Sequence, residues 1–140
     1  MIQAPPPSAV CVVERITDGD TLRCADGRRV RLVGIDAPER DQRPFGDAAR
    51  RALQRLAPEG TRVTLEPGRV RRDQFDRVLA VVRLADGTDV NERLIADGFA
   101  VRYDGADIDR AVEQRLRAAE AAARKARALS LIHISQGIVR

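Results

Sequence analysis

The sequence has few of the side chains that most often carry enzyme chemistry. Its 140 residues include one histidine, His133, and two cysteines, Cys11 and Cys24, and there is no tryptophan. With a single histidine, to which we assign no catalytic role, histidine-based triads and most zinc sites are excluded. No Walker loop and no dinucleotide-binding fingerprint occurs. Carboxylates and arginines remain as the groups available for chemistry.

Long apolar runs are also missing. No stretch approaches the roughly 20 apolar residues that span a bilayer, so we expect no membrane partner. The N-terminus, MIQAPPPSAV, lacks the basic start and apolar run of an intact signal peptide. Its three prolines predict a leader or linker over residues 1–8. The hydrophobic content of 44% predicts one globular domain, over residues 9–128.

Lysine is nearly absent. Of 25 basic residues only Lys125 is lysine, and the net charge is +4. Arginine presents a planar fork that matches phosphate, which suits a phosphate-rich ligand. A genomic base composition that favours arginine codons explains the bias equally well. Charge alone therefore does not establish nucleic-acid binding.

Cys11 and Cys24 fall on the first two expected strands, on either side of a turn at Asp18-Gly19. A simple hairpin register does not place them opposite each other, but a bulge or barrel shear would bring them together. A disulfide would indicate an oxidising compartment. The alternative is a pair of small buried hydrophobes. We favour the disulfide, and with it an exported protein, periplasmic or secreted.

Hydrophobic periodicity and turn residues predict five strands and about three helices. The order, with one helix after the third strand, is typical of a five-stranded Greek-key barrel of OB type, a mainly β fold of the α+β class. The first helix is expected over residues 44–56, the second is capped by Asn91 and ends at Gly98, and the third is capped by Asp107. Strands are expected over 9–16, 21–25, 29–35, 62–66 and 78–84, a charged loop over 67–76, and an extended segment over 100–103.

The last residues, Leu129 to Arg140, break this pattern. They begin with the apolar, uncharged run LSLIHIS, which leaves the preceding helical stripe. The run can be back-translated into the mosaic-end sequence of a library adapter. We interpret the tail as sequencing-adapter read-through, and an ordinary C-terminal β segment is the alternative.

The stretch from Asp18 to Glu39 concentrates acids at turns and strand ends. Asp20 and Asp36 lie at strand edges of one meander, so they can converge on a hard cation such as calcium, with the carbonyl of Ala37 as a further ligand. Glu39 follows a stiff proline and can hold or deprotonate an attacking water.

Arg31 lies between these acids, and Arg77 follows 46 residues later. The two arginines can clamp a phosphate and stabilise charge that builds on its oxygens. Each residue alone also has a structural interpretation. Asp18-Gly19-Asp20 is a normal hairpin turn, Asp36 can end a strand, and Arg31 can be a solvated rim residue.

Order and spacing together are more specific. The segments DGDT, RLVGIDAPE, DQFDR and VNERLIADGFA resemble the thermonuclease family, that is, the staphylococcal-nuclease-like domains, from about Val10 to about Arg127. The resemblance implies a calcium-dependent phosphodiesterase on an OB-type barrel that cuts DNA and RNA at the 5′-oxygen and leaves 3′-phosphate ends. It implies one calcium ion, held by Asp20, Asp36 and the Ala37 carbonyl. Glu39 would position or activate water, and Arg31 and Arg77 would contact the phosphate.

Some residues depart from the family pattern. Asp76 replaces a glycine next to Arg77, and the segment between Glu39 and the first helix is short. Phe75 is placed to stack or pack near the nucleotide without a hydroxyl to donate. Tyr103 is a candidate base-stacking residue, with a structural tyrosine as the alternative.

The remaining aromatics, Phe45 and Phe99, are expected in the core. Few stacking groups and many arginines favour grip on the nucleic-acid backbone and low sequence specificity. We expect a monomer that acts on DNA and RNA. The alternative function is an OB-type nucleic-acid-binding module that has lost catalysis.

Overall fold

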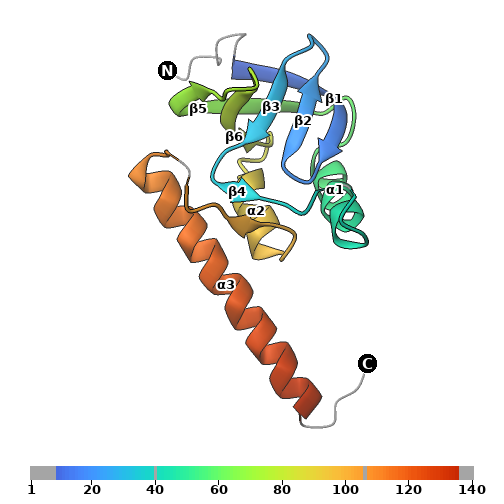
Figure 1. Ribbon diagram of the computed structural model, residues 1–140, viewed down its shortest axis with the longest axis vertical. Coiled ribbons are helices and arrows are strands. Elements are labelled where there is room, and N and C mark those ends of the chain that lie inside the picture. The colour runs from blue at the N-terminus through green and yellow to red at the C-terminus, as the bar shows by residue number, and fades with distance from the viewer. Residues whose placement is uncertain (1–8, 40, 106, 136–140) are drawn as a thin grey trace.

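A five-stranded barrel forms the body of the protein, with three helices gathered at one end of it (Figure 1). The computed structural model describes residues 9–39, 41–105 and 107–135, so the leader predicted over 1–8 and the last five residues of the tail lie outside the described part. The barrel order is β1-β2-β3-β6-β5, with β3 and β6 parallel and the other neighbours antiparallel. The predicted OB-type α+β fold is confirmed. The barrel strands are β1 (Val10–Asp18), β2 (Thr21–Cys24), β3 (Arg29–Leu32), β5 (Arg62–Arg72) and β6 (Val78–Arg83), and the helices are α1 (Phe45–Leu56), α2 (Val90–Ala96) and α3 (Arg110–Ser135).

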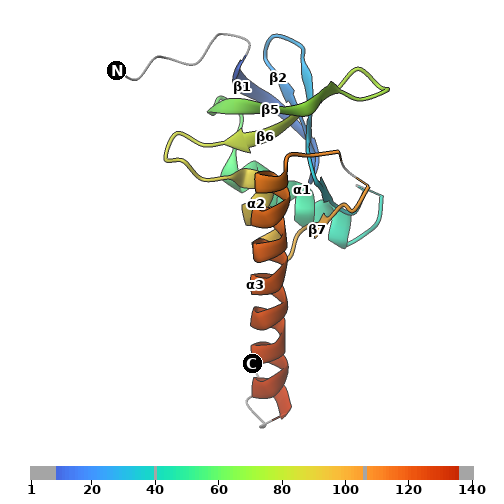
Figure 2. The same ribbon diagram turned by 90° about the vertical axis from the view of Figure 1, so that its left-hand side faces the viewer.

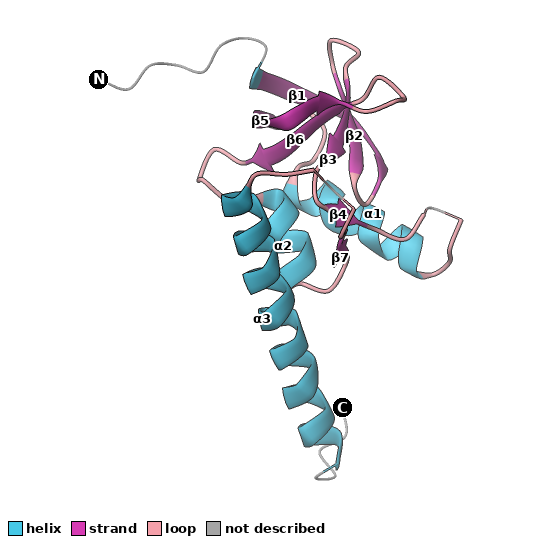
Figure 3. Cartoon of the chain, turned by 60° about the vertical axis from the view of Figure 1, so that its left-hand side comes forward, coloured by secondary structure: helices cyan, strands magenta, loops and turns pink. Residues whose placement is uncertain are grey.

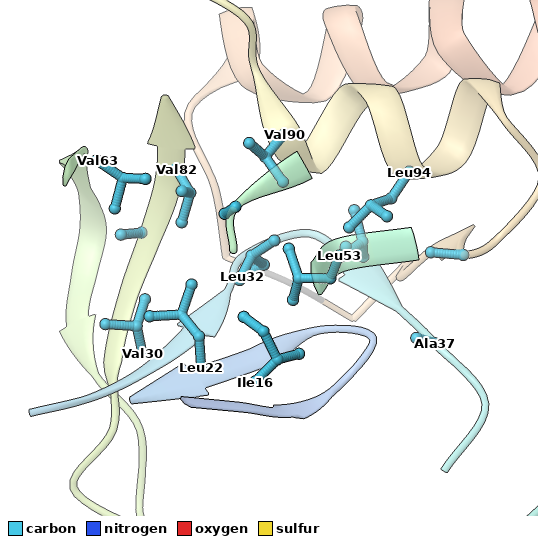
Figure 4. Close-up of a cluster of buried hydrophobic side chains, with 14 of the residues drawn as sticks. Ile16, Leu22, Val30, Leu32, Ala37, Leu53, Val63, Val82, Val90 and Leu94 are labelled. Atoms are coloured by element: carbon cyan, nitrogen blue, oxygen red, sulfur yellow. The ribbon is translucent and has the colours of Figure 1, made fainter. Parts of the chain in front are cut away.

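The core fills the barrel and continues into the helices (Figure 4). Leu22, Val30 and Leu32 are fully buried on β2 and β3, where the side chains alternate between the two faces of each strand. Leu53 of α1 and Leu94 of α2 close the same cluster from the helical end. Barrel and helices therefore share one hydrophobic core.

The strand expected over 29–35 is divided in two. It ends at Leu32, and a short strand β4 (Ile35–Asp36) pairs instead with β7 (Val101–Arg102), outside the barrel. Gly34 causes the break, because its φ of +79° is not a strand conformation. A Cβ there would lie 2.5 Å from Cδ1 of Leu116, so α3 also packs directly on this backbone. The break carries Asp36 away from the barrel wall.

Two register shifts interrupt the pairing of β1 with β2, one between Val13 and Arg15 and one between Ile16 and Asp18. Such bulges move the residues beyond them relative to a simple hairpin. Cys11 and Cys24, both buried, are joined by a disulfide with their Cα atoms 5.4 Å apart. The disulfide thus depends on the irregular register of β1 and β2, because the two cysteines are not directly opposite each other in the strand pairing.

The predicted cap of the second helix is wrong. Asp89 is the N-cap of α2, and its carboxylate accepts a hydrogen bond from the N–H of Glu92 at 3.0 Å. Asn91 is instead fully buried inside the helix, where its side chain bonds to the backbone of β6 and of Val33. Its amide is used as a tertiary link, which overrides its local capping tendency.

The helix α3 begins at Arg110, three residues later than its predicted cap. The Asp107 carboxylate lies 3.4 Å from Nε of Arg69 and pairs with the β5–β6 hairpin. That hairpin is longer than expected, because β5 extends through most of the predicted charged loop to Arg72.

The C-terminal half of α3 runs well away from the barrel (Figures 2 and 3). Residues 129–135 continue this helix, so the alternative of a β segment at the start of the tail is wrong. None of the described helices combines the length and the apolar character needed to cross a membrane.

Candidate active site

The turn between β1 and β2 lies against α1 and against residue 37. A Cβ at Gly19 would stand 2.6 Å from Cβ of Ala49 and 2.9 Å from Cβ of Ala37, so only glycine allows this approach. Asp20, the next residue, is only 7% exposed. Its Oδ2 accepts the N–H of Ala37 at 2.9 Å and its Oδ1 accepts the hydroxyl of Thr21 at 3.0 Å. The turn and the Asp36–Ala37 segment are thereby brought together.

Arg31 connects the two candidate metal ligands. It lies on β3 opposite Thr21, and its Nη2 is 3.5 Å from Oδ2 of Asp20 and 3.7 Å from Oδ1 of Asp36. Its Nη1 donates to the Leu32 carbonyl at 2.6 Å. The Arg31 side chain is 16% exposed, whereas the Asp36 side chain is 59% exposed. The carboxylate of Asp20 is therefore buried beside the Arg31 guanidinium, whereas the carboxylate of Asp36 beside the same group is open to solvent.

This arrangement fits a hard cation. Among the described residues no group of three or more histidine, cysteine or acidic side chains is placed to hold a metal. The site instead offers two carboxylates and the adjoining Ala37 backbone, an all-oxygen set that suits calcium when waters complete the shell. The exposed Asp36 leaves access for such waters. The two carboxylates carry two negative charges against the single positive charge of the Arg31 guanidinium beside them, so the three groups together still attract a cation.

A cavity of about 660 Å³ opens beside Asp36. We call it the arginine cavity, because Arg31 and Arg77 both line it, together with Asp36, Phe75 and Tyr103. The structure thus brings both candidate phosphate-binding arginines, one candidate metal ligand and both candidate stacking residues to one place.

Arg77 is held in a defined orientation. Its Nε donates to Oδ2 of Asp73 at 2.7 Å, and Oδ1 of Asp73 accepts the N–H groups of Phe75 and Arg77 at 2.9 and 3.0 Å. The Arg77 guanidinium also lies over the Phe75 ring, 5.3 Å from its centroid. Burial acts to raise the pKa of Asp73, but these bonds outweigh it and lower the pKa, so Asp73 is ionised at neutral pH.

Asp73 is a site residue to which sequence reasoning assigned no role. The signal was present, because Asp73 opens the DQFDR segment that contains Arg77. A carboxylate four residues before an arginine predicts an ion pair only if the chain turns back between them, and that turn depends on Asp76.

Asp76 has a φ of +61°, the left-handed conformation that the replaced glycine would adopt easily. Its carboxylate pairs with Nη1 of Arg72 at 3.2 Å. The negative charge of Asp76, next to Arg77 in the chain, is therefore paired with Arg72.

Because asparagine and aspartate tolerate this conformation better than alanine, we expect Asp76→Ala to lower the free energy of unfolding by about 1 kcal/mol. Asp76→Gly and Asp76→Asn should stay within about 0.5 kcal/mol of the native protein. Chemical denaturation of the three variants measures this. An equal loss in all three would show that the charge pair with Arg72, and not the backbone, sets the stability at this position.

Glu39 lies outside the arginine cavity. Its carboxylate is exposed, and its backbone forms a turn in which the N–H donates to Oε1 of Gln42 at 2.6 Å and the carbonyl accepts the N–H of Gln42 at 2.9 Å. The structure therefore fixes the backbone of Glu39 two residues beyond Ala37 and leaves its carboxylate open to water.

The two aromatics expected in the core are placed differently. Phe45 is 68% exposed, because the apolar face of α1 consists of Ala49, Ala52 and Leu53 and leaves the first residue outside. Phe99 packs against the core but is only partly buried. The core prediction is wrong for Phe45.

Comparison with known proteins gives the same family as the sequence motifs. The family model of the staphylococcal nuclease homologues matches residues 29–129. The chain is 31% identical to "Endonuclease YhcR" of Bacillus subtilis (strain 168) over 142 residues, which is 88% of this chain and 12% of that protein. It is 36% identical to an "Uncharacterized endonuclease" of Escherichia coli over 100 residues, covering 69% of this chain and 63% of that protein.

A third relative is the "Thermonuclease" of Staphylococcus intermedius, 35% identical over 97 residues, which cover 64% of this chain and 56% of that protein. The chain thus spans less than two thirds of each of these relatives. The family model, in contrast, matches more than half of the chain and includes Arg31, Asp36, Glu39 and Arg77. The chain belongs to the family of staphylococcal nuclease homologues.

Proposed function

We propose that this protein is a calcium-dependent nuclease that hydrolyses phosphodiester bonds of DNA and RNA with low sequence specificity. The observation that carries the proposal is the junction of Arg31, Asp36 and Arg77 at one cavity, with Asp20 buried behind them. Two of the relatives are named endonuclease and thermonuclease, which supports the same reaction class.

The arginines would bind the scissile phosphate from the arginine cavity. Arg77 is preoriented by Asp73, and Arg31 by the Leu32 carbonyl and the two acids, so little reorganisation is needed when charge develops on the phosphate oxygens. Asp20, Asp36 and the Ala37 carbonyl would hold calcium, which when bound supplies Lewis-acid polarisation and a template for the phosphate.

Glu39 would take a proton from the attacking water, since its carboxylate is exposed on the turn that follows Ala37. The 5′-oxygen would leave and the product would carry a 3′-phosphate. We also propose that the protein is a monomer and that it works in an oxidising compartment, which the Cys11–Cys24 disulfide supports.

Incubation of the purified protein with single-stranded DNA and with RNA tests the proposal. We expect cleavage in calcium and none in excess chelator, with products that polymerase extends only after phosphatase treatment. If the folded protein binds the DNA or RNA but does not cleave it, the proposed nuclease activity is refuted and the inactive OB-type binding module is favoured.

A further inference from the structure

A second cavity, of about 320 Å³, adjoins the candidate active site. We call it the Phe45 pocket, and its lining includes Asp36, Ala37, Phe45, Phe99 and Val101. Asp36 lines both this pocket and the arginine cavity. The two cavities therefore meet at a candidate metal ligand, where the phosphodiester to be cut would lie.

The small β4–β7 sheet runs between the two cavities. At one end the N–H of Tyr103 donates to the Gly34 carbonyl at 2.8 Å, and both residues line the arginine cavity. At the other end Asp36 faces Val101 in the register, and the chain from there to Ala37 lines the Phe45 pocket. A nucleic-acid strand bound across this sheet at Asp36 would have one cavity on each side of the phosphate at that point.

The aromatic side chains have an unusual distribution. The chain has three phenylalanines, one tyrosine and no tryptophan. Phe75 and Tyr103 line the arginine cavity, and Phe45 and Phe99 line the Phe45 pocket. The four aromatic residues are thus divided two and two between cavities that share Asp36, and aromatic faces are what unpaired bases stack on.

Within the Phe45 pocket, Phe45 is the ring available to a ligand. The Arg55 guanidinium lies over the Phe99 ring, 5.8 Å from its centroid, and Phe99 also packs on the core. Phe45 and Val101 are 68% and 63% exposed, although both are large and apolar. A cavity of this size accommodates a planar base between such side chains.

We propose that the Phe45 pocket binds the base of the nucleotide that lies across the scissile phosphate from the one held in the arginine cavity. This inference rests on the proposed nuclease function and deepens it. Two base pockets on either side of the cut require both bases to be unpaired. We therefore expect the enzyme to prefer single-stranded over double-stranded nucleic acid.

Three short single strands test this assignment. Each contains one hydrolysable phosphodiester, and all its other linkages are methylphosphonates. The first, the two-base strand, has a base on both sides of that phosphodiester. Each of the two abasic strands lacks one of these bases, the first on the 5′ side and the second on the 3′ side. On the two-base strand, Phe45→Ala should lower kcat/KM by on the order of 5- to 150-fold, the range of one lost base–aromatic stack. On one of the two abasic strands the same substitution should have no effect beyond about twofold.

Val12→Ala is the matched control, because Val12 is an exposed apolar residue of β1 that lines neither cavity. It should leave kcat/KM unchanged on all three strands. Equal losses with Phe45→Ala on every strand, or no loss on any, would overturn the assignment. If the native protein cuts none of the strands, the nuclease proposal fails, and a binding measurement decides on the pocket separately.

That binding measurement uses Phe45→Trp in a Glu39→Gln background, with calcium present. The chain lacks tryptophan, so residue 45 becomes the single reporter. We expect the two-base strand to quench its emission, and one abasic strand to bind without quenching. Identical emission changes with all strands, while fluorescence polarisation shows binding, would contradict a base in this pocket.

Discussion

Replacing Arg31 with alanine is expected to lower kcat/KM on single-stranded DNA by about 10²–10³-fold, and at the same time to tighten calcium binding by roughly tenfold. The loss follows from removal of a preoriented donor to the phosphate. The gain follows from the positions of the two carboxylates, 3.5 and 3.7 Å from the guanidinium, because that group repels a second cation at the same acids. Steady-state kinetics and calorimetric titration of calcium measure the two effects.

A lower kcat/KM together with tighter calcium binding would distinguish a catalytic role of Arg31 from a general loss of structure, which would weaken both. Arg23→Ala is the matched control, since Arg23 lies on the neighbouring strand β2, is about half exposed and lies 3.5 Å from Glu14. It should change neither quantity. If Arg31→Ala weakens calcium binding together with activity, Arg31 supports the architecture of the metal site and is not a phosphate ligand in the way we propose.

Glu39→Gln is expected to lower kcat by about 10²–10⁴-fold and to leave calcium affinity within about twofold of the native value. The amide cannot accept a proton from water, but it keeps the size and position of the side chain. The turn is held by backbone contacts with Gln42, so the free energy of unfolding should not change. Turnover, calorimetry and thermal unfolding measure the three properties.

Glu59→Gln provides the comparison, because Glu59 is another exposed glutamate in a turn, at the far end of α1. Its substitution should leave turnover unaffected. A Glu39→Gln variant that retains a rate within about threefold of the native protein would remove Glu39 from water activation. A variant that loses calcium binding would make Glu39 a metal ligand.

The barrel and the gathering of the site residues were accessible from the sequence to different extents. Strand order followed from turn residues and periodicity, which are local properties of the chain. The motifs also indicated that Arg31, Asp36 and Arg77 act together, and the structure places them at one cavity. How they meet depends on Gly34, whose positive φ ends the barrel strand early and is invisible to periodicity.

Other features were missed because tertiary contacts override local preference. The amide of Asn91 suggested a helix cap, but burial commits it to β6. The helix signal next to Phe45 suggested a core position, but the small residues of α1 occupy the face that packs inward. Asp73 acquires a partner only when Asp76 turns the chain back toward it.

The buried amide of Asn91 has a consequence for the site as a whole. It donates to the carbonyls of Val33 and Ala80 at 2.9 and 3.2 Å, and it accepts the N–H of Val82 at 3.1 Å. It therefore stands in for a peptide unit at the place where β3 stops pairing with β6. The Asn91 side chain, 58 residues after Val33, thus completes the hydrogen bonding between β3 and β6. It also holds the backbone at Val33, from which the chain leaves the barrel toward Asp36. Neither aspartate nor leucine, although similar in size, can satisfy both carbonyls and the N–H, so this position links the closure of the fold to the placement of Asp36, the proposed metal ligand.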